Sequence, residues 1–140
     1  MKTKTTVTKG ENVNKTWQLI DLKDQTLGRV CTQIAALLMG KNNLQFSFHR
    51  DDGDYVVAIN AGQIVVTGKK AKQKIYYHHT GYAGHLKEFT FQEMMKKDPR
   101  EVILHGVAGM LPKNHLRADR LRRLKVFVGA DHPYAEKLAK

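Results

Sequence analysis

The first half of the chain combines short apolar runs with one long helical pattern. Trp17 to Asp21 carries strand-favouring apolar residues and ends in a polar turn, which predicts a short strand. The next apolar residues recur at steps of three and four, which predicts a helix with one buried stripe: Leu27, Val30, Cys31, Ile34 and Leu38. Thr26 is its expected N-cap, and Gly40 its expected left-handed stop. Tyr55 to Asn60 is a continuous apolar run, typical of a strand buried on both faces. A strand, a helix and a strand in this order predict a parallel pair with a right-handed crossover.

Glycine and proline residues divide the second half of the chain into short segments. Further short strands are predicted at residues 64–67, 75–78 and 126–128, and a loop at 80–84. Thr90 and Glu93 form a capping-box pattern that predicts a helix start, and Pro99 ends or restarts that helix. Residues 100–110 continue as a helical stripe until Pro112. The element order predicts one α/β domain over residues 17–129, with a basic N-terminal arm at 1–16 and a polar C-terminal tail at 130–140.

Charge narrows the choice of partner. The 140 residues carry 24 Lys and Arg against 13 Asp and Glu, a formal net charge of +11, which favours a polyanionic partner over a small acidic substrate. No apolar run is long enough to span a membrane, and no bulky amphipathic basic helix is visible, so membrane binding is not expected. The single cysteine, Cys31, falls in an apolar helical pattern and is expected to be a small core residue in a reducing compartment. The first 16 residues lack the apolar stretch of a secretory signal; we favour a retained tail over an organellar presequence.

The densest basic segment lies between residues 113 and 125. It holds six cations against a single acid, Asp119: Lys113, Arg117, Arg120, Arg122, Arg123 and Lys125. On a helical projection the cations fall on every side, which is unlike a solvated surface helix with alternating Glu and Lys. Contact with nucleic-acid phosphates would relieve their mutual repulsion, so nucleic acid is the leading partner.

A second basic cluster precedes a run of rings. Its lysines are Lys69, Lys70, Lys72 and Lys74, and the rings that follow are Tyr76, Tyr77, His78 and His79. The rings could stack on bases, or they could belong to a strand whose side chains alternate between inside and outside; the sequence leaves both interpretations open. Backbone N–H groups near Gly81, Gly84 and Leu27-Gly28-Arg29 could cradle phosphate, although none of these segments is a nucleotide-binding loop.

Two metal-dependent interpretations have weaker support than nucleic-acid binding. His78 and His79 with His85 could suggest zinc, but neighbouring strand residues point to opposite faces and no further ligand stands at a recognised spacing. His49, Asp51, Asp52 and Asp54 could support magnesium-assisted phosphoryl transfer or hydrolysis, but a turn that starts a strand explains the same residues. We expect no cofactor and no metal. An enzyme using His49, Asp51 and Asp54 remains the alternative, followed by a free nucleic-acid regulator.

Many short motifs in order make the chain resemble a known family. They are Trp17 and Asp21, Leu27-Gly28-Arg29, Gly40-Lys41, Gly53-Asp54, Asn60-Ala61, Thr67-Gly68-Lys69, Tyr76-Tyr77-His78-His79-Thr80-Gly81, Gly109-Met110-Leu111-Pro112-Lys113, Leu124-Lys125-Val126 and His132-Pro133. Together they resemble the thirteenth protein family of the large ribosomal subunit in its bacterial and organellar form. The chain departs from the family pattern at Leu116-Arg117-Ala118, where Leu-Gly-Arg is usual, at His85 in place of a glycine, and at Cys31 in place of a common alanine.

The resemblance implies a three-layer α/β/α domain with a largely parallel sheet of about four strands. It also implies a non-catalytic, structural role: binding of large-subunit ribosomal RNA beside neighbouring ribosomal proteins, early entry into subunit assembly, and no small-molecule substrate. The expected location is the ribosome in the cytoplasm, with the bacterial cytosol favoured over an organelle. The expected RNA-contacting residues are Arg29, Lys41, Lys69, Lys70, Lys72, Lys74, Tyr77, His78, His79, Gly81, Lys113, Arg117, Arg120, Arg122, Arg123 and Lys125.

Overall fold

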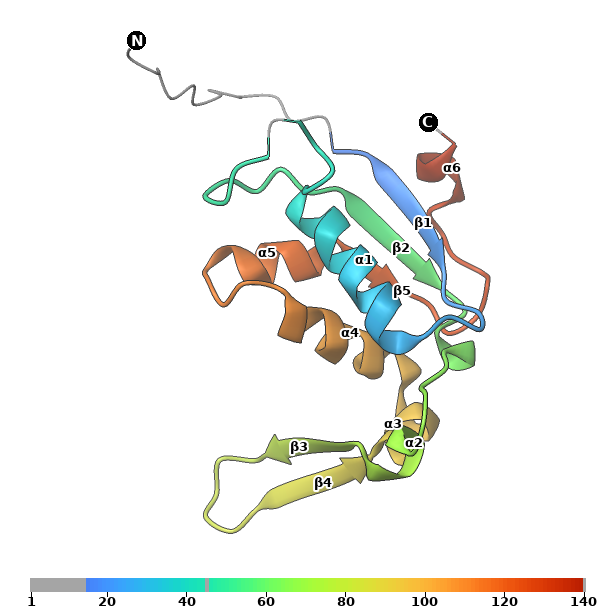
Figure 1. The fold of residues 1–140 in the computed structure, drawn as a ribbon, viewed down its shortest axis with the longest axis vertical. Helices are drawn as coiled ribbons and strands as arrows, with labels where there is room; N and C mark the ends of the chain where they lie inside the picture. Colours follow the sequence, from blue (N-terminus) through green and yellow to red (C-terminus); the bar gives the residue numbers. More distant parts are fainter. Residues whose placement is uncertain (1–14, 45, 140) are drawn as a thin grey trace.

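The computed structural model describes residues 15–44 and 46–139 (Figure 1). Residues 1–14 of the predicted basic arm therefore lie outside the described residues. The elements are β1 (Trp17–Asp21), α1 (Leu27–Met39), β2 (Tyr55–Ile59), the 3-10 turn η1 (Ala61–Gln63), α2 (Lys70–Gln73), β3 (Ile75–His79), β4 (Leu86–Thr90), α3 (Phe91–Lys97), α4 (Pro99–Met110), α5 (Leu116–Arg122), β5 (Leu124–Val126) and α6 (Ala135–Leu138).

The main sheet is parallel and has the strand order β1-β2-β5. Its register pairs Trp17 with Tyr55 and Val56 with Leu124. The α/β class and the largely parallel sheet are thus confirmed. The sheet has three strands rather than about four, because the segment predicted as a strand at 64–67 forms only one parallel bridge, between Thr26 and Val65. The segment that contains Thr26 continues as the helix α1 from Leu27, so the bridge is not followed by a second bridge.

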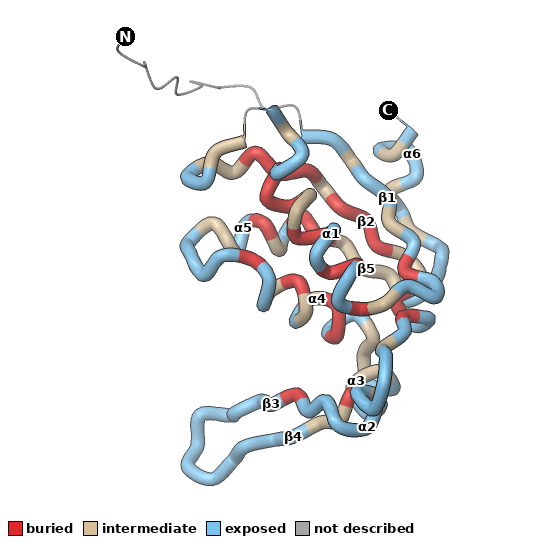
Figure 2. The backbone as a smooth tube through the Cα atoms, viewed as in Figure 1, coloured by how far each residue is buried: buried red, intermediate tan, exposed pale blue. Residues whose placement is uncertain are grey.

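The core lies between α1, α4 and one face of the sheet (Figure 2). The predicted stripe of α1 is confirmed: Leu27, Val30, Cys31, Ile34 and Leu38 are all buried. The two helices approach closely, since a Cβ on Gly106 of α4 would lie 2.7 Å from the Sγ of Cys31. Burial raises the pKa of the Cys31 thiol to about 11, with a small opposing effect of Lys74. Cys31 is therefore a protonated core residue, as the sequence predicts.

The opposite face of the sheet is covered by the C-terminal segment. Trp17 stacks on its cross-strand partner Tyr55 at 4.4 Å between ring centroids, and Tyr134 stacks on Trp17 at 5.1 Å. The side chains of a strand alternate between faces, so these rings lie opposite the core residues Val56 and Ala58. The expected third layer is consequently thin, consisting of this aromatic stack and the four-residue helix α6.

Helix ends follow the sequence signals closely. The capping box is present: the Thr90 N–H donates to Glu93 at 2.8 Å, and the Glu93 N–H donates to the Thr90 hydroxyl at 3.4 Å. Pro99 occupies the first turn of α4, and Gly40 ends α1 with φ of +77°. The Thr26 side chain, in contrast, makes no capping hydrogen bond.

The elements absent from the sequence-based prediction include the short helices α2 and α6 and the strand β4, and the last strand is shifted. Strand β4 pairs with β3 in an antiparallel hairpin that extends away from the main sheet (Figure 1). The last strand begins at Leu124 rather than Val126, because pairing with β2 starts directly after α5, where the Arg123 carbonyl accepts from the Val56 N–H at 3.1 Å.

Candidate nucleic-acid interface

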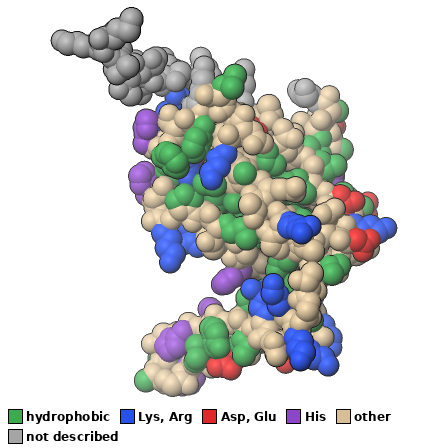
Figure 3. All heavy atoms as spheres, in the orientation of Figure 1, with side chains coloured by type: hydrophobic (Ala, Val, Ile, Leu, Met, Phe, Trp, Pro, Cys, Tyr) green, Lys and Arg blue, Asp and Glu red, His purple; other side chains and the backbone are tan. Residues whose placement is uncertain are grey.

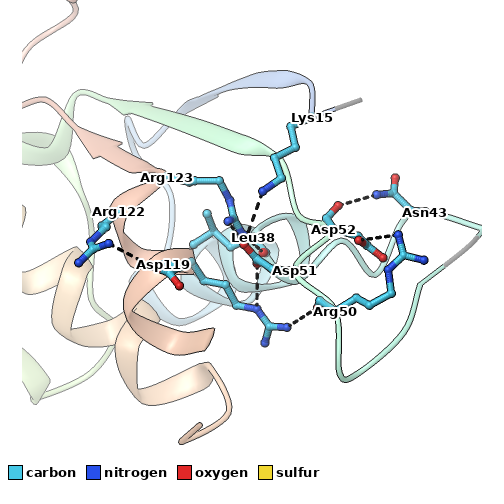
Figure 4. A network of polar contacts seen from close by, with 10 residues as sticks. Lys15, Leu38, Asn43, Arg50, Asp51, Asp52, Asp119, Arg122 and Arg123 are labelled. Carbon is cyan, nitrogen blue, oxygen red and sulfur yellow. Dashed lines mark hydrogen bonds and ion pairs between the residues drawn. The ribbon is translucent and has the colours of Figure 1, made fainter. Parts of the chain in front are cut away.

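Two of the predicted RNA-contacting arginines are buried. The side chains of Arg120 and Arg123 are 2% and 6% exposed, and both form ion pairs with Asp51 in the loop before β2. Figure 4 shows the Arg123 side chain directed toward Asp51. Arg123 donates two hydrogen bonds to the Asp51 carboxylate and a third to the Leu38 carbonyl at 3.0 Å. Arg120 donates to the Arg50 carbonyl at 3.1 Å. These two arginines hold the fold together and have almost no surface to offer a phosphate.

The Arg123 contacts join three parts of the chain that are distant in sequence. Leu38 lies in the last turn of α1, where backbone carbonyls have no partner within the helix. Arg123 satisfies one of them and at the same time binds the loop that leads into β2. Burial alone would raise the pKa of Asp51, but the hydrogen bonds and charge of Arg123, followed by the charges of Lys15 and Arg120, lower it below its ordinary value.

The acidic residues of the alternative enzyme site are already engaged. Asp51 is bound to Arg123, and Asp54 accepts a hydrogen bond from the Thr16 N–H at 2.9 Å. Asp52 pairs with Arg50 at 3.1 Å, while His49 is exposed. Within residues 15–44 and 46–139, no group of three or more His, Cys, Asp or Glu side chains is placed to hold a metal ion. The Asp51-Asp52-Gly53-Asp54 run is thus used for structure, as a turn at the start of β2.

The lysines around α2 have a different environment. Lys69, Lys70, Lys72 and Lys74 are all exposed, and no ion pair connects them to an acidic residue in the part of the chain that the structure describes. Figure 3 shows Lys and Arg side chains gathered over this end of the molecule, near α2 and α3. Cations that are exposed and unpaired are free to neutralise phosphates.

The rings predicted beside these lysines lie on β3. Tyr77, His78 and His79 are exposed, whereas Tyr76 is 4% exposed and belongs to the core. The structure thus confirms a strand with one ring inside and the others outside, while base stacking by the exposed rings stays a prediction. Gly81 lies in the exposed turn of the hairpin with φ of +93°, a conformation that favours glycine.

The remaining predicted contacts are spread over the body of the molecule. Arg29 is exposed on α1, and Lys41 is exposed just after it. Lys113 and Arg122 are exposed near α5, while Arg117 and Lys125 are half-buried. The structure thus brings the predicted residues into two main groups, one at α2 and β3 and one around α5, rather than one continuous site (Figure 1).

A cleft between the hairpin and α4 was not predicted from the sequence. It has a volume of about 540 Å³, and its walls include Lys87 of β4, Lys97 of α3, and Glu101 and His105 of α4. Figure 3 shows the molecule hollowed between the hairpin and the body, with histidine side chains at its borders. The available signal for β4 was the glycine-containing turn that follows a predicted strand, since Leu86–Thr90 itself shows no regular alternation of apolar and polar residues.

No helix in residues 15–44 and 46–139 combines the length and the apolar character needed to cross a bilayer.

Comparison with known proteins gives a consistent result. The family model described as "Ribosomal protein L13" matches residues 15–133. A protein from Clostridioides difficile named "Large ribosomal subunit protein uL13" is 50% identical over 132 residues, covering 94% of this chain and 92% of its own length. Two further proteins of the same name are similar. The one from Thermosipho africanus is 48% identical over 94% of this chain and 89% of its own length. The one from Nitratidesulfovibrio vulgaris is 46% identical over 89% of this chain and 87% of its own length. The chain belongs to the ribosomal protein L13 family.

Proposed function

We propose that this chain is a structural constituent of the large ribosomal subunit, which binds and stabilises large-subunit ribosomal RNA and takes part in early assembly. The observation that carries the proposal is the group of lysines at α2, which are exposed and form no ion pair with any described residue, next to the exposed rings of β3. Phosphate contacts from these lysines would position the protein on folded RNA, and the shape of the RNA would set where it binds.

The proposed contacts are those predicted residues that the fold leaves at least partly accessible. They are Arg29, Lys41, Lys69, Lys70, Lys72, Lys74, Tyr77, His78, His79, Gly81, Lys113, Arg117, Arg122 and Lys125. Arg120 and Arg123 leave this set, because their guanidinium groups are buried against Asp51 and backbone carbonyls. Their role is to stiffen the scaffold that presents the other cations.

The rest of the proposal follows from this role. Residues 17–129 form one domain, flanked by a basic arm at 1–16 and a tail at 130–140. The chain performs no reaction, and its partners are ribosomal RNA and neighbouring large-subunit proteins in the cytoplasm of a bacterium. The phosphoryl-transfer alternative has no comparable support, since Asp51 and Asp54 already serve as hydrogen-bond acceptors within the fold.

Replacing Lys70 and Lys72 together by glutamine is expected to weaken binding to large-subunit ribosomal RNA and to flatten its salt dependence. Each lost phosphate contact removes roughly 0.7–0.9 from the slope of log K against log salt, so the pair should remove about 1.5. The measurement is the affinity for an rRNA transcript by filter binding between low and moderate salt.

A double replacement of Lys23 and Lys137 by glutamine is the matched control. Both lysines are exposed and lie outside the proposed contact set, and the net charge falls by the same amount. The control should bind with nearly the wild-type slope. Equal slopes for the two double variants would show that only the overall charge matters, and would contradict the assignment of contacts to α2.

A further inference from the structure

The cleft between the hairpin and α4 has the chemistry of a base-binding site. Two of its residues, Glu101 and His105, are exposed and lie one helical turn apart, so their side chains project from the same face of α4. A planar ring and a carboxylate are thereby placed next to each other along the axis of α4.

The His105 imidazole is held in a defined orientation. It packs edge-to-face against the buried Tyr76, with 5.4 Å between ring centroids and 85° between ring planes. Tyr76 is anchored in the core, which fixes the ring against which His105 packs. An exposed ring with a fixed orientation is a platform on which an unpaired base can stack.

Glu101 is the acid in the cleft that is available to a ligand. The neighbouring Asp98 carboxylate also lines the cleft, but it is taken up by Arg100, which donates to both of its oxygens at 3.0 Å. No hydrogen bond or ion pair connects the Glu101 carboxylate to another side chain among the described residues. It therefore offers two oxygens that only accept hydrogen bonds.

A carboxylate distinguishes one base from the other three. The Watson–Crick edge of guanine carries two adjacent donors, N1–H and the N2 amino group, which match the two oxygens of a carboxylate. Adenine and cytosine place an acceptor nitrogen beside their amino group, and uracil places a carbonyl on each side of its N3–H. These acceptors would face the carboxylate oxygens and be repelled.

Cations border the same cleft. Lys87 projects from β4, and Lys97 lies at the end of α3 with its ammonium 4.7 Å from the Phe89 ring centroid. Both lysines are exposed, and no ion pair holds either of them within the described part of the chain. Their ammonium groups can bind the phosphates on either side of a base that enters the cleft.

We propose that this cleft binds a single unpaired guanosine of RNA, with the base stacked on His105, its Watson–Crick edge on Glu101 and its flanking phosphates near Lys87 and Lys97. This inference rests on the proposed ribosomal function and deepens it by naming a base-specific contact. It predicts that the chain makes one base-specific contact, in addition to its electrostatic contacts with phosphates.

The test uses kethoxal, which modifies guanine at N1 and N2, the two atoms that would face Glu101. Large subunits are reconstituted with the full wild-type chain, with Glu101→Gln, or with Glu136→Gln, an exposed glutamate on α6 that matches the change in charge. We expect one unpaired guanine to be protected in wild-type and Glu136→Gln particles. In Glu101→Gln particles its reactivity should rise by about fivefold or more, as the loss of a bidentate base contact implies.

The outcomes separate this inference from the proposed function. If all three chains incorporate and no guanine changes, the cleft binds no guanine, while the ribosomal role stands. If the wild-type chain does not enter the particle, both fail. If only Glu101→Gln fails to incorporate, the comparison moves to short RNAs with a central guanosine or inosine, which lacks the N2 amino group. A preference for guanosine that is lost in Glu101→Gln supports the cleft, and equal affinities overturn it.

Discussion

Replacing Arg123 by alanine is expected to lower the free energy of unfolding by roughly 3–5 kcal/mol, the usual cost of removing one partner of a buried ion pair. The truncation leaves the partly buried Asp51 carboxylate without its two strongest donors and leaves the Leu38 carbonyl unpaired at the end of α1. It also disconnects the start of β5 from the loop before β2. The measurement is equilibrium unfolding in urea, followed by circular dichroism.

The adjacent arginine is the matched control. Arg122 is 80% exposed on its side chain and pairs with Asp119 across one helical turn. Arg122→Ala should therefore cost at most about 1 kcal/mol, as surface ion pairs usually do. Similar losses for Arg122→Ala and Arg123→Ala would mean that the buried contacts of Arg123 contribute little, which would contradict its assignment to the scaffold.

Gly53→Ala is expected to destabilise the fold by at least about 3 kcal/mol, at the upper end of the cost of overpacking. A Cβ at this position would lie 1.8 Å from the Leu38 carbonyl oxygen and 2.4 Å from its carbon. Both are backbone atoms of α1, so no side chain can rotate to make room. The last turn of α1 and the start of β2 would have to separate, which would also disturb the nearby Arg123 guanidinium at 3.1 Å.

Gly109→Ala provides the comparison for this variant. Gly109 lies in α4, and a Cβ there meets no atom within 4 Å. Alanine is favoured over glycine inside a helix by about 0.5–1 kcal/mol, so this variant should be slightly more stable than the wild type. Thermal unfolding of both variants distinguishes a steric conflict from a general sensitivity to alanine; a Gly53→Ala protein as stable as the wild type would rule out the close approach.

The elements with strong local signals were predictable. Helix α1 carries an apolar stripe of regular period and a terminal glycine, and the start of α3 carries a capping box. These features depend on residues within a few positions of one another, so the sequence displays them directly. The parallel pairing of β1 with β2 followed from the order of elements.

Contacts between distant residues were not predictable in the same way. A helical projection places Arg120 among the leucines of this segment and Arg122 on the opposite side, but it cannot show that Asp51, about 70 positions earlier, is the partner of the buried arginines. The hairpin is another example, since the residues of β4 do not alternate between apolar and polar. The cleft depends on both the hairpin and α4, and so it is visible only in three dimensions.

The buried and exposed cations have complementary roles in this account. Arg123 and Arg120 fix the loop before β2 against α1 and α5, and this gives the domain a stiff frame. The side chains of Lys70 and Lys72 in α2 face solvent, and no ion pair holds them within the described part of the chain. A rigid frame loses little conformational entropy on binding, which favours stable association with folded RNA.

The central claim is that this chain is a stoichiometric, RNA-bound part of the large ribosomal subunit. The most direct measurement is quantitative mass spectrometry of large subunits purified on a sucrose gradient from the source cell and washed in moderate salt. We expect one copy of the chain per subunit, retained with the ribosomal RNA. Washed subunits that lack the chain, with the protein recovered near the top of the gradient, would contradict the account.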